Sequence, residues 1–504
     1  MILKNTMVGW ASRLLNFLVA MVSTPLLVHY LGEASFGIWL LLMNLWNFLS
    51  LLDLGLYQAF VRRAADDLAA EDQEGLAATV RTGLSLYLLV SLLTLGLYAL
   101  VIPCLGCLFN IPAELLTTVQ WAAVPLAVVS ALYFPSRIYE GLLFARERIL
   151  VFDSVGMFLG TLRLGLLWLA LAGGWGLWGV ALVFSLTTLG EYLIVTLLCR
   201  RHMGRAATFQ AGWDRGRVRM MVSYAAGAML NIIGLKARRQ APSLMLGALA
   251  DPVALARFGV SMRLLTYSSD LVTAGSLAVQ PRFSLLEAQA RGEELSRLLI
   301  RANLYTGFLA GWLGVGLWFL AEPFIGLWLG PDFNLSGQMV RLMVLPLCLS
   351  MALGPCEAIL YSLKRQRFTG WLSLAEVALL AGLALMLIPR WGAMGAAVSL
   401  GVCLVLLRPW LLTLYVCRSL GLGWGRFWVK GPGRAALSLA VACLPLAWLF
   451  RAWRVTGWVE LMAAGVVVSL ACGLAFALLG LGWEERRFWR EKLTGFMARR
   501  SRGA

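Results

Sequence analysis

Hydrophobic residues occur along the chain in long runs separated by short polar segments, and these runs predict membrane-spanning helices. An α-helix needs about twenty apolar residues to cross a bilayer. Measured against that length, the chain contains about fourteen candidate segments, centred near residues 18, 46, 89, 127, 160, 187, 230, 267, 313, 348, 379, 403, 442 and 470. We therefore expect an all-α polytopic membrane protein without a sizeable soluble domain.

Composition supports this prediction. Hydrophobic residues make up 60% of the 504 residues and charged residues only 14%, whereas about a quarter of a soluble globular chain is charged. The first apolar run follows Lys4 directly and shows no small-residue cleavage site. We expect it to be retained as a helix and not removed as a signal peptide.

The net charge of +17 is explained by topology. If the N-terminus lies inside, about 31 of the 43 Lys and Arg residues fall in the loops and the tail on that side, and we place Arg137 in one of these loops, between the fourth and fifth helices. The opposite side carries only Arg390, Arg451 and Arg454. Because cytoplasmic loops are enriched in cations, we expect both termini in the cytoplasm and no nucleic-acid partner.

Two motifs recur at nearly the same spacing. The segment "YEGLLFARER" at 139–148 resembles "CEAILYSLKR" at 356–365, and "WGLWGVA" at 175–181 resembles "WGAMGAA" at 391–397, an offset of about 216 residues. We infer two six-helix lobes, 1–216 and 217–432, followed by two additional helices in 433–482 and a basic tail at 483–504. Lobes of six helices share one orientation, and parallel repeats of this kind commonly flank a central transport site.

Cysteine and histidine give no metal framework. The nine cysteines are scattered, and Cys104 and Cys107 fall in a segment that we expect to be a short external loop, either as a disulfide or as two apolar residues. With two histidines and no phosphate-binding glycine loop in the chain, we expect no metal, no cofactor and no direct use of ATP.

The opening of the chain carries a family resemblance. The segments "ASRLLNFLVAMVSTPLLVHYLGEASFGIWLLL" and "SLLDLGLYQAFVRR" contain Arg13, Pro25, Leu31-Gly32, Phe36-Gly37 and Leu54-Gly55. With these marks, and with loose patterns to about the twelfth helix, the chain resembles the bacterial polysaccharide flippases of the multidrug/oligosaccharidyl-lipid/polysaccharide exporter superfamily.

The resemblance implies two lobes around a central cavity in the bacterial cytoplasmic membrane. It also implies export of undecaprenyl-pyrophosphate-linked oligosaccharide, such as an O-antigen or capsular or exopolysaccharide repeat unit, by alternating access. The protein would then be a transporter and not an enzyme, with other membrane proteins of polysaccharide assembly as candidate partners.

Cations inside the predicted spans are the candidate substrate ligands. Arginine donors bind phosphate oxygens in pairs, so we assign Arg13, Lys236, Arg239 and Arg263 to the pyrophosphate. Lys236 and Arg239 share one helical face, whereas Arg238 points elsewhere. If the seventh helix begins early, Lys236, Arg238 and Arg239 instead extend to the lipid headgroups at the outer surface. For Lys236 and Arg239 both the cavity and the outer surface stay open, whereas for Arg238 we favour the outer surface.

Other charged positions have weaker assignments. Arg163, in the middle of the fifth span, either lines the cavity or pairs between helices, and Arg341 and Arg408 are expected to reach the membrane surface. Asp53 and Asp270 are candidates for binding a coupling H⁺ or Na⁺, unless the membrane potential drives transport. Asp270 follows Arg263 by seven residues and could form a salt bridge with it.

Three rival functions were weighed. A multidrug or cation antiporter on the same scaffold would need more buried carboxylates than cations. A membrane glycosyltransferase or polymerase would need acidic catalytic clusters or a large external loop. A pure scaffold has no need of arginine in mid-span, since a charge there is costly.

Overall fold

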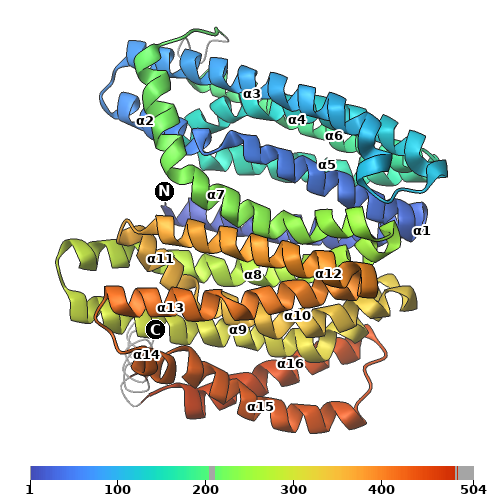
Figure 1. The fold of residues 1–504 in the computed structure, drawn as a ribbon, viewed down its shortest axis with the longest axis vertical. Coiled ribbons are helices and arrows are strands. Elements are labelled where there is room, and N and C mark those ends of the chain that lie inside the picture. Colours follow the sequence, from blue (N-terminus) through green and yellow to red (C-terminus); the bar gives the residue numbers. More distant parts are fainter. Residues whose placement is uncertain (1, 204–209, 483–484, 486–504) are drawn as a thin grey trace, which may run out of the picture. The chain divides into compact units, whose positions relative to one another are not determined.

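Long helices make up the chain (Figure 1). The computed structural model describes residues 2–203, 210–482 and 485, and within these residues every regular element is helical. The helices are α1 (Ile2–Leu49), α2 (Leu56–Ala69), α3 (Gln73–Leu108), α4 (Ala113–Ala145), α5 (Ile149–Ala172), α6 (Gly176–Met203), α7 (Arg215–Leu249), α8 (Pro252–Ala288), α9 (Gly292–Leu329), α10 (Asn334–Ala352), α11 (Gly354–Ser362), α12 (Gln366–Leu406), α13 (Arg408–Ser419), α14 (Trp424–Lys430), α15 (Pro432–Ala452) and α16 (Trp458–Ala475). Short helical turns occur at η1 (Ser50–Asp53), η3 (Pro331–Phe333) and η4 (Phe476–Gly480).

All fourteen predicted segment centres lie within these helices, so the predicted all-α polytopic fold is confirmed. Two of the helices, α1 and α12, each consist of two helical segments joined at a kink. The kinks lie at Gly32 and Gly392, where the backbone φ and ψ angles are not helical. Ten helical segments in the described part are long and apolar enough to cross a membrane by length and composition. The predicted tail, 483–504, lies outside the described residues except for Glu485.

The repeated motifs mark matching left-handed residues. Glu147 and Lys364 occupy matching places in the first motif, and both have a left-handed φ, of 57° and 56°. Gly176 and Gly392 match in the second motif, with φ of 57° and 53°. Both motifs therefore place a left-handed residue at the matching position in each copy. In the second motif Gly176 begins α6, whereas Gly392 forms a kink within α12.

The turn at the first motif is a helix C-cap. In both copies the next residue donates its backbone N–H to the carbonyl five residues earlier, Arg148 to Leu143 and Arg365 to Leu360, each at 2.8 Å. This hydrogen bond satisfies a carbonyl that the end of the helix would otherwise leave without a partner. The same turn, with a left-handed residue, also joins α8 to α9 at Ala290.

The chain forms two compact units. The first contains residues 1–259 and 373–396, and the second contains 260–372 and 397–504. Compactness and internal repetition are different properties, so the lobe boundaries expected from the repeat stay a prediction. In the first unit the core lies where α2, α3 and α4 meet, around Phe60, Tyr87, Phe134, Ile138 and Leu142.

The second unit has its own core. Side chains from α8, α9, α11, α13 and α14 meet there, among them Phe283, Leu299, Ile359, Leu412 and Phe427. In water the burial of such side chains drives helix packing, whereas between helices in a bilayer that driving force is missing and close van der Waals fit takes its place.

Within the first unit, the start of α7 is tied to α2 and α3. Asp67 is 3% exposed and accepts from Arg63 at 2.8 Å, from Arg217 at 3.1 Å and from the Thr79 hydroxyl at 2.5 Å. At the far end of α7, the Asn110 N–H donates to the Gly247 carbonyl at 3.1 Å. These contacts hold both ends of α7 against other segments of the first unit.

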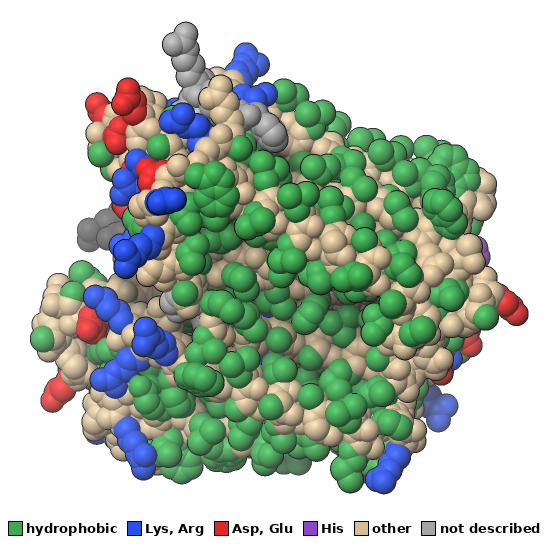
Figure 2. Space-filling view, turned by 45° about the horizontal axis from the view of Figure 1, so that its top comes forward, with side chains coloured by type: hydrophobic (Ala, Val, Ile, Leu, Met, Phe, Trp, Pro, Cys, Tyr) green, Lys and Arg blue, Asp and Glu red, His purple; other side chains and the backbone are tan. Residues whose placement is uncertain are grey.

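The surface is that of a membrane protein. On the face shown in Figure 2, hydrophobic side chains cover the broad middle of the surface, and Lys and Arg side chains lie toward its edges. Leu92, Leu100, Trp121, Phe158 and Leu444 are each more than 60% exposed. Because a soluble protein rarely exposes apolar surface so extensively, we conclude that the protein is a multi-pass membrane protein.

The cysteine pair is placed differently from our expectation. Cys104 and Cys107 lie in the last turns of α3 and not in a loop, because the helix continues past Pro103 to Leu108. Both are exposed and free.

Candidate functional site

The membrane helix that begins after Gly32 is interrupted between α1 and α2. α1 ends at Leu49, the turn η1 follows, and Leu54 and Gly55 adopt left-handed φ values of 46° and 92°. Such a break leaves backbone carbonyls at the end of the first half without helical partners. Broken helices are tolerated at membrane depth where other groups satisfy the freed backbone, and they often form binding sites.

Lys236 supplies a partner for this break. Its Nζ donates to the backbone carbonyl and to the hydroxyl of Ser50, each at 3.2 Å. A cation is favoured at the C-terminal end of a helix by the helix dipole. This contact explains why an apolar run carries a lysine, because the ammonium group compensates the interrupted helix.

Asp53 lies at the same break. Its side chain is buried, with 8% exposed, and accepts a hydrogen bond from the Tyr87 hydroxyl at 2.6 Å. Lys236 and Arg137 are both within electrostatic range of Asp53. Opposite charges and a hydroxyl donor thus compensate a carboxylate that would be costly to bury alone.

Arg137 belongs to the same charged group, which corrects our placement of it in a loop. The structure puts it inside α4, eight residues before the helix ends, because α4 extends to Ala145. Its guanidinium pairs with Glu140 at 2.5 Å and lies over the ring of Tyr57, 3.6 Å from the centroid. The Tyr57 hydroxyl donates to the other Glu140 oxygen at 3.2 Å.

Arg163 is held by α6. Its Nε donates to the Thr187 hydroxyl at 2.7 Å and its Nη2 to the Thr188 hydroxyl at 3.0 Å. The guanidinium also lies 4.6 Å from the ring centroid of Phe184. Glu191 is its nearest acidic neighbour in electrostatic terms. Arg163 therefore joins two helices, one of the two alternatives that the sequence left open, and it also lines a pocket within the first unit. A place for it in a central cavity between the lobes stays a prediction.

The pocket that Arg163 lines, the α4–α6 pocket, has a volume of about 250 Å³ and lies within the first unit. Residues from four helices line it: Trp46 of α1; Tyr133, Ser136, Arg137 and Glu140 of α4; Phe152 and Arg163 of α5; Phe184, Thr188, Glu191, Tyr192 and Val195 of α6. Two guanidinium groups face two carboxylates, and aromatic rings fill much of the remaining wall. The pocket is therefore polar but formally neutral, inside helices that cross the membrane.

Arg238 and Arg239, the cations that follow Lys236 in α7, have different surroundings. Arg238 forms an ion pair with Glu376 at 3.4 Å, and their side chains are 16% and 0% exposed. This pairing corrects our preference for Arg238 at the membrane surface, since a fully buried carboxylate draws the guanidinium inward. Arg239 is exposed. Arg13 lies in α1, but its side chain falls outside the described part of the structure.

In the second unit, Arg263 and Asp270 lie on α8. Arg263 is partly buried, Asp270 is exposed, and Tyr267 between them is within electrostatic range of both. The three residues thus share one helical face, as their spacing predicts. The roles assigned to Arg263 and Asp270 stay predictions.

Arg408 is also in the second unit and was expected to reach the membrane surface. The structure contradicts this: its side chain is 1% exposed and pairs with Glu357. Glu357 is the glutamate of the second repeat motif and corresponds to Glu140 of the first. Both copies of this glutamate therefore pair with an arginine, and the first copy also lines the α4–α6 pocket.

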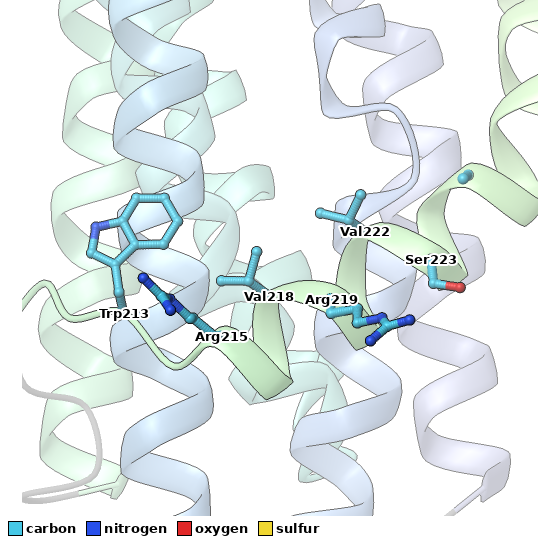
Figure 3. A pocket seen from close by; sticks show the side chains of 7 residues that line it. Trp213, Arg215, Val218, Arg219, Val222 and Ser223 are labelled. Atoms are coloured by element: carbon cyan, nitrogen blue, oxygen red, sulfur yellow. The ribbon is translucent and has the colours of Figure 1, made fainter.

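A larger hollow lies at the start of α7 (Figure 3). It has a volume of about 560 Å³ and is lined by Trp213, Arg215, Val218, Arg219, Val222, Ser223 and Ala226. All seven residues come from one continuous segment, so the hollow is a groove along a single helix face. A site that encloses a ligand needs walls from several elements. A hollow of about 570 Å³ in the second unit has such walls, from α9, α10 and α15, and contains the ion pair Arg341–Glu322 at 2.8 Å. The α4–α6 pocket differs from it in presenting two arginines and two glutamates together.

Sequence reasoning missed most of this pocket. It identified Arg163, but not Tyr133, Arg137, Glu140 or Tyr192 as site residues. A signal was present, since Tyr133, Arg137 and Glu140 follow one another at helical spacings of four and three and share one face of α4. A polar stripe at helical spacing inside an apolar segment predicts a buried polar site.

Comparisons with known proteins place this geometry in context. The sequence model of a family described as polysaccharide biosynthesis protein matches residues 2–287. The chain is 25% identical over 503 residues, 94% of each chain, to the "Uncharacterized membrane protein EpsK" of Bacillus subtilis (strain 168).

Two solved structures illustrate the likeness of the fold. The lipid II flippase MurJ in an inward closed conformation matches with a TM-score of 0.73 and 13% identity, over 94% of this chain and 99% of that chain. An inward-facing multidrug resistance MATE family transporter of the MOP superfamily matches with a TM-score of 0.66 and 14% identity, over 80% and 98%. At such identities the likeness shows a shared fold, and function must be argued from the site.

Proposed function

Because this chain belongs to the polysaccharide biosynthesis protein family, we propose that it moves an oligosaccharide linked to undecaprenyl pyrophosphate across the bacterial cytoplasmic membrane by alternating access. The cargo is a repeat unit of O-antigen, capsule or exopolysaccharide. The protein acts as a transporter and not as an enzyme, and other membrane proteins of polysaccharide assembly are its candidate partners.

The α4–α6 pocket is the observation that supports this function best. A glycan head is large and hydrated, and it crosses hydrocarbon only if protein groups replace its water. The pocket presents Arg137, Glu140, Arg163 and Glu191 together, inside helices that are long and apolar enough to span a membrane. Ionisable side chains are costly at that depth and are retained mainly for function.

Within this proposal, the pyrophosphate is bound by the cations assigned from the sequence, Arg13, Lys236, Arg239 and Arg263. Lys236 is the best supported of them, because it lies at a broken helix, where membrane transporters commonly bind ions and substrate groups. Asp53 at the same break is the first candidate for a coupling H⁺ or Na⁺, with Asp270 the second.

A cationic-drug extruder is disfavoured by the charges themselves. The buried and half-buried carboxylates that the helices of the first unit bring together each have a cation beside them: Asp53 has Lys236 and Arg137, Asp67 has Arg63 and Arg217, Glu140 has Arg137, Glu191 has Arg163, and Glu376 has Arg238. No surplus of negative charge remains among these described groups to attract a cationic drug.

Deletion in the native host tests the proposal. Without the protein, we expect the lipid-linked oligosaccharide to accumulate on the cytoplasmic leaflet and the surface glycan to be lost. Plasmid copies of the wild type and of Glu293→Gln, whose side chain is 95% exposed, should restore both. Normal surface glycan without accumulation in the deletion strain would contradict the function.

Coupling and topology need separate measurements. In proteoliposomes, Asp53→Asn should transport without dependence on the H⁺ or Na⁺ gradient, and full dependence would exclude Asp53 as the ion site. Alkaline phosphatase fused after Ser419 or after the C-terminus should stay inactive if these positions are cytoplasmic, and fusion at Arg454 should be active.

A further inference from the structure

We propose that the α4–α6 pocket binds one uncharged pyranose ring of the cargo glycan, and not its pyrophosphate. This inference rests on the proposed function and assigns a ligand class to a site inside the first unit. It also revises the role of Arg163, which the sequence assigned to substrate anions.

Charge balance argues against an anion in this pocket. Arg137 is already paired with Glu140, and Arg163 is engaged by Thr187 and Thr188. A pyrophosphate would bring several negative charges beside Glu140 and Glu191, and like charges repel strongly where water is scarce. A neutral ligand with many hydroxyl groups meets no such penalty and can use donors and acceptors of both signs.

Groups that lack partners point to such a ligand. Within the described part of the chain, the Glu191 carboxylate accepts no hydrogen bond, and the hydroxyls of Tyr133 and Tyr192 donate none, although all three residues line the pocket. All three residues are half-buried, so these polar atoms are available to a ligand that enters the pocket. The Arg137 Nε beside them is buried and has no hydrogen-bond partner, although buried polar groups are normally satisfied. One carboxylate and two phenols present both acceptors and donors to sugar hydroxyls.

The aromatic walls suit a sugar ring. Trp46, Tyr133 and Tyr192 form a continuous group, with Trp46 and Tyr133 centroids 6.4 Å apart and Tyr133 and Tyr192 centroids also 6.4 Å apart. Phe184 meets Trp46 edge-to-face at 5.3 Å. Aromatic rings combine apolar faces with specific geometry, and the C–H face of a pyranose is apolar whereas its rim carries the hydroxyls.

The volume sets the size of the ligand. About 250 Å³ is below the roughly 300–1,000 Å³ of pockets that enclose a drug-sized molecule. One ring fits this space, and a whole repeat unit does not. The pocket therefore selects a single sugar residue, and the rest of the glycan remains outside it.

The two copies of the motif glutamate are paired differently. Glu140 pairs with Arg137 of its own helix, whereas Glu357 pairs with Arg408 of α13, an arginine that is 1% exposed. The α4–α6 pocket lies at the first copy, and the sugar site is assigned to that unit.

Calorimetric titration of the purified full-length protein tests the ligand class. The probes are glucose, galactose, N-acetylglucosamine, N-acetylgalactosamine and inorganic pyrophosphate. We expect at least one sugar to bind with saturation and pyrophosphate not to compete with it. Glu191→Gln and Tyr192→Phe should each weaken sugar binding about tenfold, the usual effect of losing one hydrogen bond in a site.

Matched variants control for indirect effects. Glu293→Gln and Tyr415→Phe make the same chemical changes far from the pocket in sequence, and they should leave sugar affinity unchanged. Thermal melting of every variant identifies any that fail to fold, and Tyr192→Phe keeps the ring, so it is the variant least able to disturb packing. Unchanged sugar affinity in both pocket variants, or competition by pyrophosphate, would overturn the inference.

The transport assay separates this inference from the proposed function. Two results would each show that the pocket is not a sugar site: the wild type transports the lipid-linked oligosaccharide while no sugar binds, or Glu191→Gln and Tyr192→Phe transport it at the wild-type rate. After either result the proposed function would stand. If wild type binds a sugar but does not move the lipid-linked cargo, the proposed function fails and the pocket keeps its ligand class.

Discussion

The ammonium group of Lys236 lies 3.2 Å from both the backbone carbonyl oxygen and the hydroxyl oxygen of Ser50, where a membrane helix is interrupted. In the hydrocarbon core of a membrane, both the ammonium group of Lys236 and the unpaired carbonyls at the end of α1 are energetically unfavourable, and this contact brings them together. Each compensates the other, and neither would be stable at this depth alone.

Lys236→Met should therefore destabilise the protein by about 1–3 kcal/mol, because Ser50 and the end of the helix lose a charged donor. Lys236→Arg should retain part of the stability, since it keeps the charge. Thermal unfolding in detergent measures the change. Lys430→Met makes the same change at an exposed lysine and is the control, and an equal loss there would show that the Ser50 contact contributes nothing.

The pair formed by Arg408 and Glu357 allows a sharper test. Arg408→Met removes a buried cation and leaves Glu357 uncompensated, so we expect a loss of about 3 kcal/mol. The double variant with Glu357→Met should recover most of it, because no lone charge remains. Chemical unfolding of the four proteins of this cycle gives the coupling energy.

An exposed ion pair serves as the comparison, because we expect it to contribute little to stability. Arg297 and Glu293 lie 3.8 Å apart with side chains 68% and 95% exposed. Arg297→Met should change stability by less than about 1 kcal/mol. If Arg408→Met is equally harmless, the pair does not hold α11 to α13.

A substitution in the turn between α11 and α12 should increase the stability of the protein. Lys364 has a φ of 56°, which glycine adopts without the steric penalty that other residues incur. Lys364→Gly should stabilise the protein by about 0.5–1 kcal/mol, while Lys364→Ala should not. A higher melting temperature for the glycine variant alone checks this, and a lower one would exclude a strained turn.

The N-terminus of α7 should depend on pH. Asp214 is exposed at the N-cap of α7, and hydrogen bonds from the backbone N–H groups of Arg217 and Gly216 lower the pKa of its carboxyl below the ordinary 3.8. Because the folded pKa is depressed, the stabilisation is present above pH 3.8 and is lost as pH falls through the lower, folded pKa.

Amide hydrogen exchange measures this effect. Protection of the Gly216 and Arg217 amides should decrease below about pH 4, relative to neighbouring amides, once intrinsic rates are corrected. Asp214→Asn, which cannot titrate, should show no such step. A step that persists in the asparagine variant would assign it to another group.

The sequence by itself determined the all-helical fold and the positions of its apolar segments, because these depend on local properties. A run of apolar residues must become a helix in a bilayer to satisfy its own backbone, and the two motifs marked matching positions that both have a left-handed φ, Glu147 with Lys364 and Gly176 with Gly392. The family resemblance rested on similar local marks, and the family model confirmed it.

Only the tertiary structure decided which charges meet. Arg238 and Glu376 are 138 residues apart in the chain, and Lys236 and Ser50 are 186 apart. Spacing along one helix predicts neighbours on that helix but carries no information about the helix packed against it. For this reason Arg137 and Arg408 were misplaced from the sequence, since whether an arginine reaches water or a carboxylate depends on how the helices pack.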